Sequence, residues 1–116
     1  MTPEYAIAYA AMEKVRDAHG FTLMPIHIIV EQLGDVPFDG PKYLRLDVDD
    51  EMGHSAAQRI QPNATYLQLW EAADTAYAQL REKNPKANVL SGIKFIDGFA
   101  LEHDTVVVRT KDSEGA

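Results

Sequence analysis

The sequence predicts an α+β fold, a two-layer sandwich in which two helices pack on a mainly antiparallel sheet. Two stretches, one at the N-terminus and one in the middle of the chain, repeat apolar residues at helical spacing. The segments between and after them are short, either alternating or rich in β-branched residues, and are bounded by Gly, Pro and Asp. The order of elements is therefore α-β-β-α-β-β, with one further strand near the C-terminus, in a single domain over residues 1–110.

The first helix is expected over residues 3–19. Thr2 can cap it, Pro3 suits the first helical position, and Gly20 follows as a C-terminal stop. Its apolar stripe consists of Tyr5, Ala8, Tyr9, Met12 and Val15. One face of this helix should therefore pack against the rest of the domain.

The next part of the chain predicts two strands separated by a loop. Pro25 precedes a run of isoleucine and valine that favours a buried strand over 26–31. A short helix that begins at Pro25 and ends before Gly34 fits the same residues and stays open as an alternative. Residues 34–41 are rich in Gly, Pro and Asp and should form a loop. Residues 42–48 alternate between apolar and polar, which is typical of a half-buried strand.

The second helix is expected over residues 63–83. Its apolar stripe is continuous and consists of Tyr66, Leu69, Trp70, Ala73, Tyr77 and Leu80. Residues 65–70 also alternate, so a strand that leads into a shorter helix is the competing interpretation; the continuous stripe favours the helix. Residues 52–61, just before it, have no clear period and predict an irregular connection or a short helical turn.

The C-terminal part predicts a β-meander. Residues 93–96 and 99–101 flank Asp97-Gly98, a pair typical of two-residue hairpin turns. His103 and Asp104 form another turn before a β-branched strand over 105–110. Residues 111–116 are expected to be a polar tail.

Composition excludes several classes of protein. The chain has 116 residues, no cysteine and a net charge of −7. Without cysteine there are no disulfides, thiolate nucleophiles or cysteine-ligated metals. The acidic charge argues against direct binding of nucleic acid and allows a protein partner, which can be basic. No apolar run is long enough to cross a bilayer, so we expect a cytoplasmic protein that does not contact membranes.

Residues 45–54 hold the densest group of carboxylates in the chain. Asp47, Asp49, Glu51 and His54 are the candidate ligands for a divalent cation, because hard cations prefer oxygen ligands. Their spacing fits no EF-hand loop, and Arg45 offers Asp47 an ion pair that needs no metal. We therefore expect no metal here and a solvated strand end instead.

Catalytic constellations are absent from the sequence. The candidates for acid–base chemistry are Asp47, Asp49, His54 and His103, and no spacing requires that they act together. The chain has no glycine-rich phosphate loop and no dinucleotide-binding fingerprint, so we expect no cofactor. A small enzyme or ligand binder, either cofactor-free or dependent on a divalent metal, is the alternative function.

The preferred hypothesis is a small acidic protein-interaction or assembly module without catalysis. Its candidate contact residues are Val36 and Phe38 in the loop, together with Asp49, Asp50 and Glu51 as an acidic surface. Phe38 can instead tuck under its own loop, which we favour. The uncharged run 106–108 suggests a homo-oligomer joined through the meander. The element order is broadly similar to that of phage tail-terminator subunits at the level of fold. Phage or mobile-element origin is thus an expectation, as a tail-assembly subunit or an inhibitor of a host defence protein.

Overall fold

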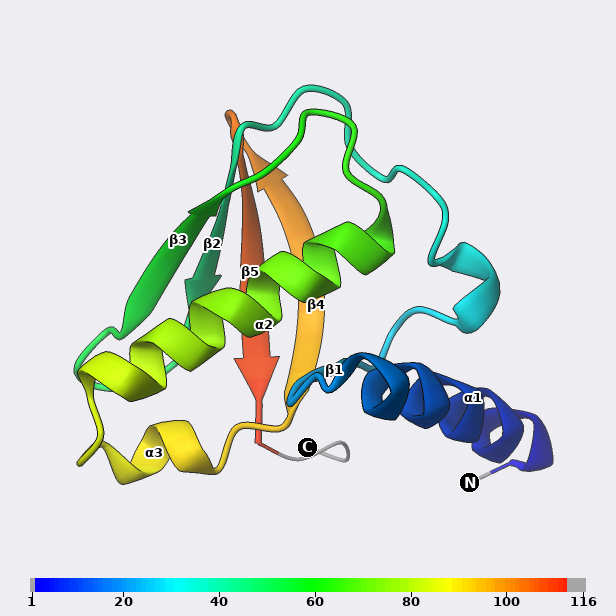
Figure 1. Cartoon of the computed structure of the whole chain (residues 1–116), viewed down its shortest axis with the longest axis horizontal. Coiled ribbons are helices and arrows are strands. Elements are labelled where there is room, and N and C mark those ends of the chain that lie inside the picture. The colour runs from blue at the N-terminus through cyan, green and yellow to red at the C-terminus, as the bar shows by residue number, and fades with distance from the viewer. Residues whose placement is uncertain (1, 113–116) are drawn as a thin grey trace.

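The structure, a computed structural model, describes residues 2–112 and consists of one mixed sheet with helices on one side (Figure 1). The helices are α1 (Pro3–His19), α2 (Tyr66–Lys83) and α3 (Asn88–Ser91), with a 3-10 turn η1 (Val30–Gln32). The strands are β1 (Met24–Pro25), β2 (Tyr43–Asp47), β3 (Ser55–Arg59), β4 (Phe95–Glu102) and β5 (Thr105–Lys111). The predicted fold class, a two-layer α+β sandwich, is confirmed.

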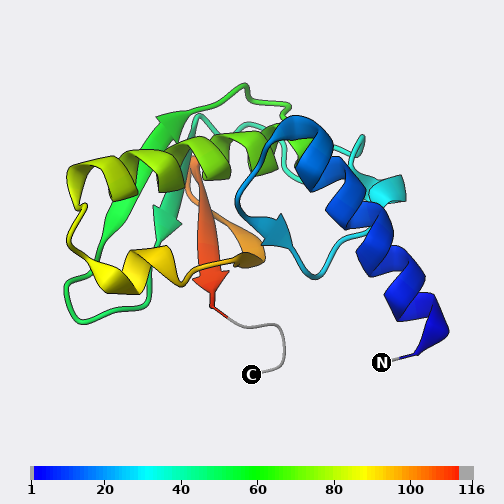
Figure 2. The ribbon, with the colours of Figure 1, turned by 60° about the horizontal axis from the view of Figure 1, so that its bottom comes forward.

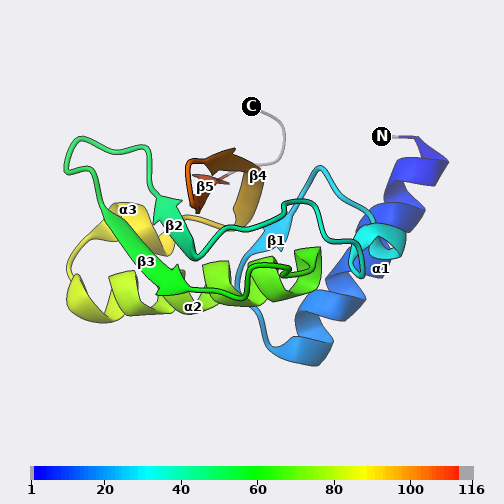
Figure 3. The same ribbon diagram turned by 90° about the horizontal axis from the view of Figure 1, so that it is seen from above.

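The strand order of the sheet is β1-β4-β5-β2-β3. β2 pairs with β3 and β4 pairs with β5 in antiparallel fashion, whereas β1–β4 and β2–β5 are parallel pairs. The sheet is therefore mixed, with β5 at its centre and β1 and β3 at its edges. Figure 3 shows α2 along one face of the sheet, while no helix covers the opposite face of β2, β3 and β5.

Helix α2 supplies six buried residues of the core. Thr65 caps it through a reciprocal pair of bonds with Gln68, so the helix begins at Tyr66, three residues later than predicted. The predicted stripe is buried: Leu69, Trp70, Ala73, Tyr77 and Leu80 are at most 3% exposed. These side chains meet Leu44, Leu46, Val106 and Val108 from the central strands, which are fully buried. The burial of this large apolar area is what holds the two layers together.

Helix α1 extends away from the sheet and contacts the rest of the protein mainly through β1 and η1 (Figure 2). Thr2 and Gly20 cap it as predicted, the latter in the left-handed conformation. Only Met12 among its residues is buried, and Ile7 is 72% exposed. The stripe predicted for this helix is thus only partly covered.

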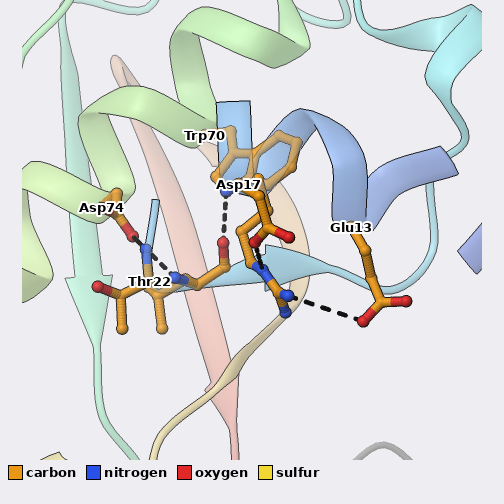
Figure 4. Close-up of polar contacts among 7 residues, drawn as sticks. Glu13, Asp17, Thr22, Trp70 and Asp74 are labelled. Carbon is orange, nitrogen blue, oxygen red and sulfur yellow. Dashed lines mark hydrogen bonds and ion pairs between the residues drawn. The ribbon is translucent and has the colours of Figure 1, made fainter. Parts of the chain in front are cut away.

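Three hydrogen bonds fasten the segment after α1 to α2 (Figure 4). The Asp74 carboxylate accepts the backbone N–H groups of Thr22 at 2.9 Å and Leu23 at 2.8 Å. The indole N–H of Trp70 donates to the carbonyl of Leu23 at 2.7 Å. This junction sets where β1 enters the sheet.

The strand predicted over 26–31 is wrong. Pairing with β4 lasts only for Met24 and Pro25, after which the chain leaves the sheet. Ile26 and Ile28 still pack against the core, and η1 follows directly. The alternating apolar residues thus belong to an extended segment that packs on the core. Their side chains are covered although the backbone of this segment has no partner strand. The alternative helix is present only as the short turn η1.

Residues 52–61, predicted to be irregular, contain β3. Its sequence, Ser-Ala-Ala-Gln-Arg, has no β-branched or aromatic residue, so propensity gave no signal. The strand exists because β2 pairs with it over its whole length without a register shift.

The hairpin predicted at Asp97-Gly98 is also wrong, since β4 runs through this pair as one strand with a register shift between Ile96 and Gly98. The turn at His103 and Asp104 is confirmed, with φ of 58° at His103. Of the tail predicted over 111–116, Lys111 ends β5 and residues 113–116 lie outside the described part of the chain. Helix α3 was not predicted. None of the helices within residues 2–112 is long and apolar enough to span a membrane.

Candidate interaction surface

The residues of the acidic stretch lie around the β2–β3 turn but face different directions. Asp47 is in β2 on the uncovered face of the sheet, and Arg45 holds it with two bonds of 2.9 Å and 3.1 Å. The hydrogen bond and the charge of Asp47 raise the pKa of Arg45 above its ordinary value. The carboxylate of Asp47 is therefore already paired with Arg45 of the same strand.

Asp50 and His54 form the second pair of this turn. The Nδ1 atom of His54 lies 2.5 Å from Asp50 Oδ2, and the His54 backbone N–H donates to Oδ1 at 3.0 Å. The two side chains are 7% and 14% exposed. Burial raises the pKa of Asp50, but the hydrogen bonds and charge of His54 outweigh burial and bring it below its usual range. This pair stabilises the turn from within.

The candidate catalytic residues are not brought into one site. Asp47 and His54 lie on opposite faces of the hairpin, because Asp47 is opposite Ser55 and side chains alternate along a strand. Asp49 is exposed and lines a shallow groove beside α3. His103 lies at the other end of the sheet, in the turn between β4 and β5. Within residues 2–112, no three His, Asp or Glu side chains are placed to hold a metal ion.

The two apolar loop candidates behave differently. Phe38 is half-buried and packs against the core, as the preferred interpretation of the loop predicted. Val36 is 49% exposed. The loop thus offers a single exposed apolar side chain and not a continuous patch.

An additional polar cluster joins the segment after β1 to β4 and β5, and sequence spacing gave no sign of it. The Nε2 atom of His27 lies 3.0 Å from Asp97 Oδ1, and Lys111 Nζ approaches the same oxygen at 3.7 Å. The side chain of His27 is 65% exposed. At that exposure we interpret the cluster as a surface ion pair that closes this edge of the sheet.

The opposite edge of the sheet, formed by β3, is open. Val48 donates its backbone N–H to His54, and Ile60 donates to Lys42, at the two ends of the β2–β3 ladder. In an antiparallel pair every second residue directs its backbone groups toward the partner strand. The backbone N–H and C=O groups of Ala56 and Gln58 therefore bond to β2. Those of Ser55, Ala57 and Arg59 point outward, away from the sheet.

A groove of about 250 Å³ lies between this edge and α2. Its walls are residues 58–61, which are the end of β3 and the two residues after it, and the α2 residues Gln68, Glu71, Ala72 and Thr75. The amide of Gln58 donates to Gln79 of α2 at 2.7 Å and so fixes β3 against the helix. The groove thus borders the same edge whose backbone groups are unpaired.

Comparison with protein-family models, with curated proteins and with solved structures gives no match for this chain. Its function must therefore be argued from the geometry of its own residues.

The sequence predicted exposed β edges in general, but the run that it named for a contact between copies is not at an edge of the sheet. Val106, Val107 and Val108 belong to β5, which lies between β4 and β2 and is at most 3% exposed at these residues. No other chain can pair with a strand that already has two neighbours. The open strand, β3, was not predicted as a strand at all, so no sequence signal marked Ser55, Ala57 and Arg59.

Proposed function

We propose that this protein is a non-catalytic interaction or assembly module that binds an extended segment of another polypeptide as an additional strand beside β3. The observation that carries the proposal is the unpaired backbone of Ser55, Ala57 and Arg59 along a regular edge strand. Strand addition draws its affinity from main-chain hydrogen bonds.

Edge strands of soluble proteins are usually protected against such pairing by proline, bulges or inward-pointing charges. β3 contains no proline, and its register with β2 has no shift. Its outward-directed residues include Ser55 and Ala57, whose small side chains leave the backbone accessible. The only charged residue on this strand is Arg59. The edge is therefore open to a partner, apart from the protection given by its short length.

The groove beside the edge supports a preference for polar segments. Alternate side chains of an added strand would point toward α2. There they would meet glutamine, threonine and the carboxylate of Glu71, above an apolar floor that includes Ile60 and Ala72. Arg59 also lines the groove, so its lining carries one charge of each sign and favours a segment with polar side chains.

A library of random peptides selected against the folded protein tests the proposal. Bound peptides should slow hydrogen exchange at the amides of Ser55, Ala57 and Arg59, because these amides would become donors to the added strand. Ala57→Pro should abolish binding, since proline removes the central outward N–H. Ala57→Val is the matched control and should retain binding. Selected peptides that protect other amides, or that bind Ala57→Pro equally well, would contradict the proposal.

A further inference from the structure

We infer that the strand added beside β3 is β3 of a second copy of this chain, paired antiparallel about a two-fold axis at Ala57. This inference rests on the proposed function and names its partner. The result would be a continuous sheet of twice the width, shared by two chains.

The register follows from the parity of the strand. Only Ser55, Ala57 and Arg59 direct their backbone groups outward. A symmetric pairing that uses all three of these residues sets Ala57 opposite Ala57 of the second copy and Ser55 opposite Arg59. This arrangement allows about six backbone hydrogen bonds between the two strands. A shift by one residue would allow none, and a shift by two residues would leave one outward residue of each strand without a partner in the other, so this register gives the largest number of bonds.

Side chains at the contact do not oppose this approach. On the uncovered face the axis passes through Ala57, which is small, and no helix lies on that face (Figure 3). On the other face, the α2 residues that lie beside β3 include Thr75 and Gln79, which are uncharged. The α2 helices of the two copies would run antiparallel in the same layer with mainly polar, uncharged side chains between them, and Glu71 is the charged α2 residue that lines the groove.

Opposite charges lie at the two ends of the β3 edge, which favours antiparallel pairing with a second copy of the chain. At the Ser55 end, the β2–β3 turn carries Asp49 and Glu51, both exposed. At the other end lie Arg59 and Lys42, also exposed. Antiparallel pairing brings the acidic end of each copy beside the basic end of the other, and the two-fold axis produces this contact twice.

These charges are available because the other charges near the turn are already paired. Asp47 is bound by Arg45, and Asp50 by His54. Within residues 2–112, in contrast, Asp49, Glu51, Arg59 and Lys42 form no ion pair. An arginine side chain opposite Ser55 of the second copy is long enough to reach toward Glu51 in the adjoining turn.

Sedimentation of the full chain over a range of concentrations tests the inference. We expect a dimer, and we expect Arg59→Glu to raise its dissociation constant about tenfold or more, because two contacts become repulsive. Glu51→Arg alone should weaken the dimer similarly. The double variant Arg59→Glu with Glu51→Arg should restore it, since the swapped charges are again complementary. Restoration would also show that the loss of dimer in the single variants comes from the charges at positions 51 and 59.

A cross-link tests the register itself. The chain has no cysteine, so Ala57→Cys introduces a single thiol that would face its own copy across the axis. A short bis-maleimide should then link the two chains, whereas Ala100→Cys, an exposed alanine in β4, should give no dimer. A wild-type protein that stays monomeric up to about 1 mM would overturn the inference. So would a dimer that neither Arg59→Glu nor Ala57→Pro weakens. If the protein is monomeric but selected peptides still protect the β3 amides, only the identity of the partner fails; if neither occurs, the proposed function fails as well.

Discussion

Asp74 holds the segment between α1 and β1 in place, and its replacement tests this junction (Figure 4). Asp74→Ala removes the acceptor for two backbone N–H groups. The N–H of Thr22 is in an exposed environment and can bond to water, whereas that of Leu23 is partly buried. The partly buried N–H of Leu23 would be left without an acceptor, at a cost of about 1–3 kcal/mol, so the free energy of unfolding should fall by about 2 kcal/mol. Asp74→Asn keeps the acceptor oxygen and should preserve both bonds.

The charge of Asp74 adds a dependence on pH. Burial raises the pKa of this carboxyl, and the hydrogen bonds from Leu23 and Thr22 only partly offset the effect. A raised pKa means that the folded state binds the proton more tightly than the unfolded state. The contribution of Asp74 to stability is therefore fully present below the unfolded pKa of about 3.9 and is lost as pH rises through the folded pKa. Asp74→Asn should accordingly be at least as stable as wild type at pH 7, with a smaller difference at pH 4.

Urea unfolding followed by the fluorescence of Trp70 measures these effects, because Trp70 is the only tryptophan and is fully buried. A loss of about 2 kcal/mol should lower the urea midpoint of Asp74→Ala by roughly 1 M or more. If Asp74→Ala were as stable as wild type, or if Asp74→Asn were as unstable as Asp74→Ala, the reasoning from these two bonds would be refuted.

Two further predictions concern pairs within the fold. Asp50→Ala should be less stable than wild type at pH 7 and equally stable near pH 2. The lowered pKa of Asp50 contributes stability above the pKa of the unfolded state, and this stability is lost as pH falls through the pKa of the folded state. Acid titrations of both proteins by circular dichroism check this, and an equal loss at both pH values would contradict it. Tyr77→Phe should cost about 1 kcal/mol, since the hydroxyl donates to the carbonyl of Leu90; calorimetry measures it, and an unchanged melting temperature would show that the bond contributes nothing.

The two long helices could be predicted from sequence because their signals are local. Capping residues such as Thr2 and Gly20, and a stripe at helical spacing, act within a few turns of one segment. Only the start of α2 differed, where Thr65 and Gln68 form the cap in place of an earlier residue. The strand over 43–47 could be predicted equally well, since its apolar and polar residues alternate and one face of the strand is buried.

The errors in the strands all involve pairing, which depends on more than one segment of the chain. Asp97-Gly98 has the composition of a hairpin turn, but a two-residue turn needs positive φ angles. Gly98 does not have one, whereas His103 does, so the chain reverses after His103. Strand β3 owes its conformation to β2 and not to its own residues. The candidate site was missed for this same reason, because an edge exists only once the order of strands is known.

Residue-resolved hydrogen exchange of β3 in the assembled protein tests the central claim most directly. In the free chain the amides of Ser55, Ala57 and Arg59 point away from β2 and should exchange rapidly, whereas those of Ala56 and Gln58 are in the ladder and should be protected. When a partner strand is bound, the three outward amides should become protected, and Ala57→Pro should prevent this change at the other two. If they exchange rapidly in every bound state while amides elsewhere become protected, β3 is not the edge that this protein uses.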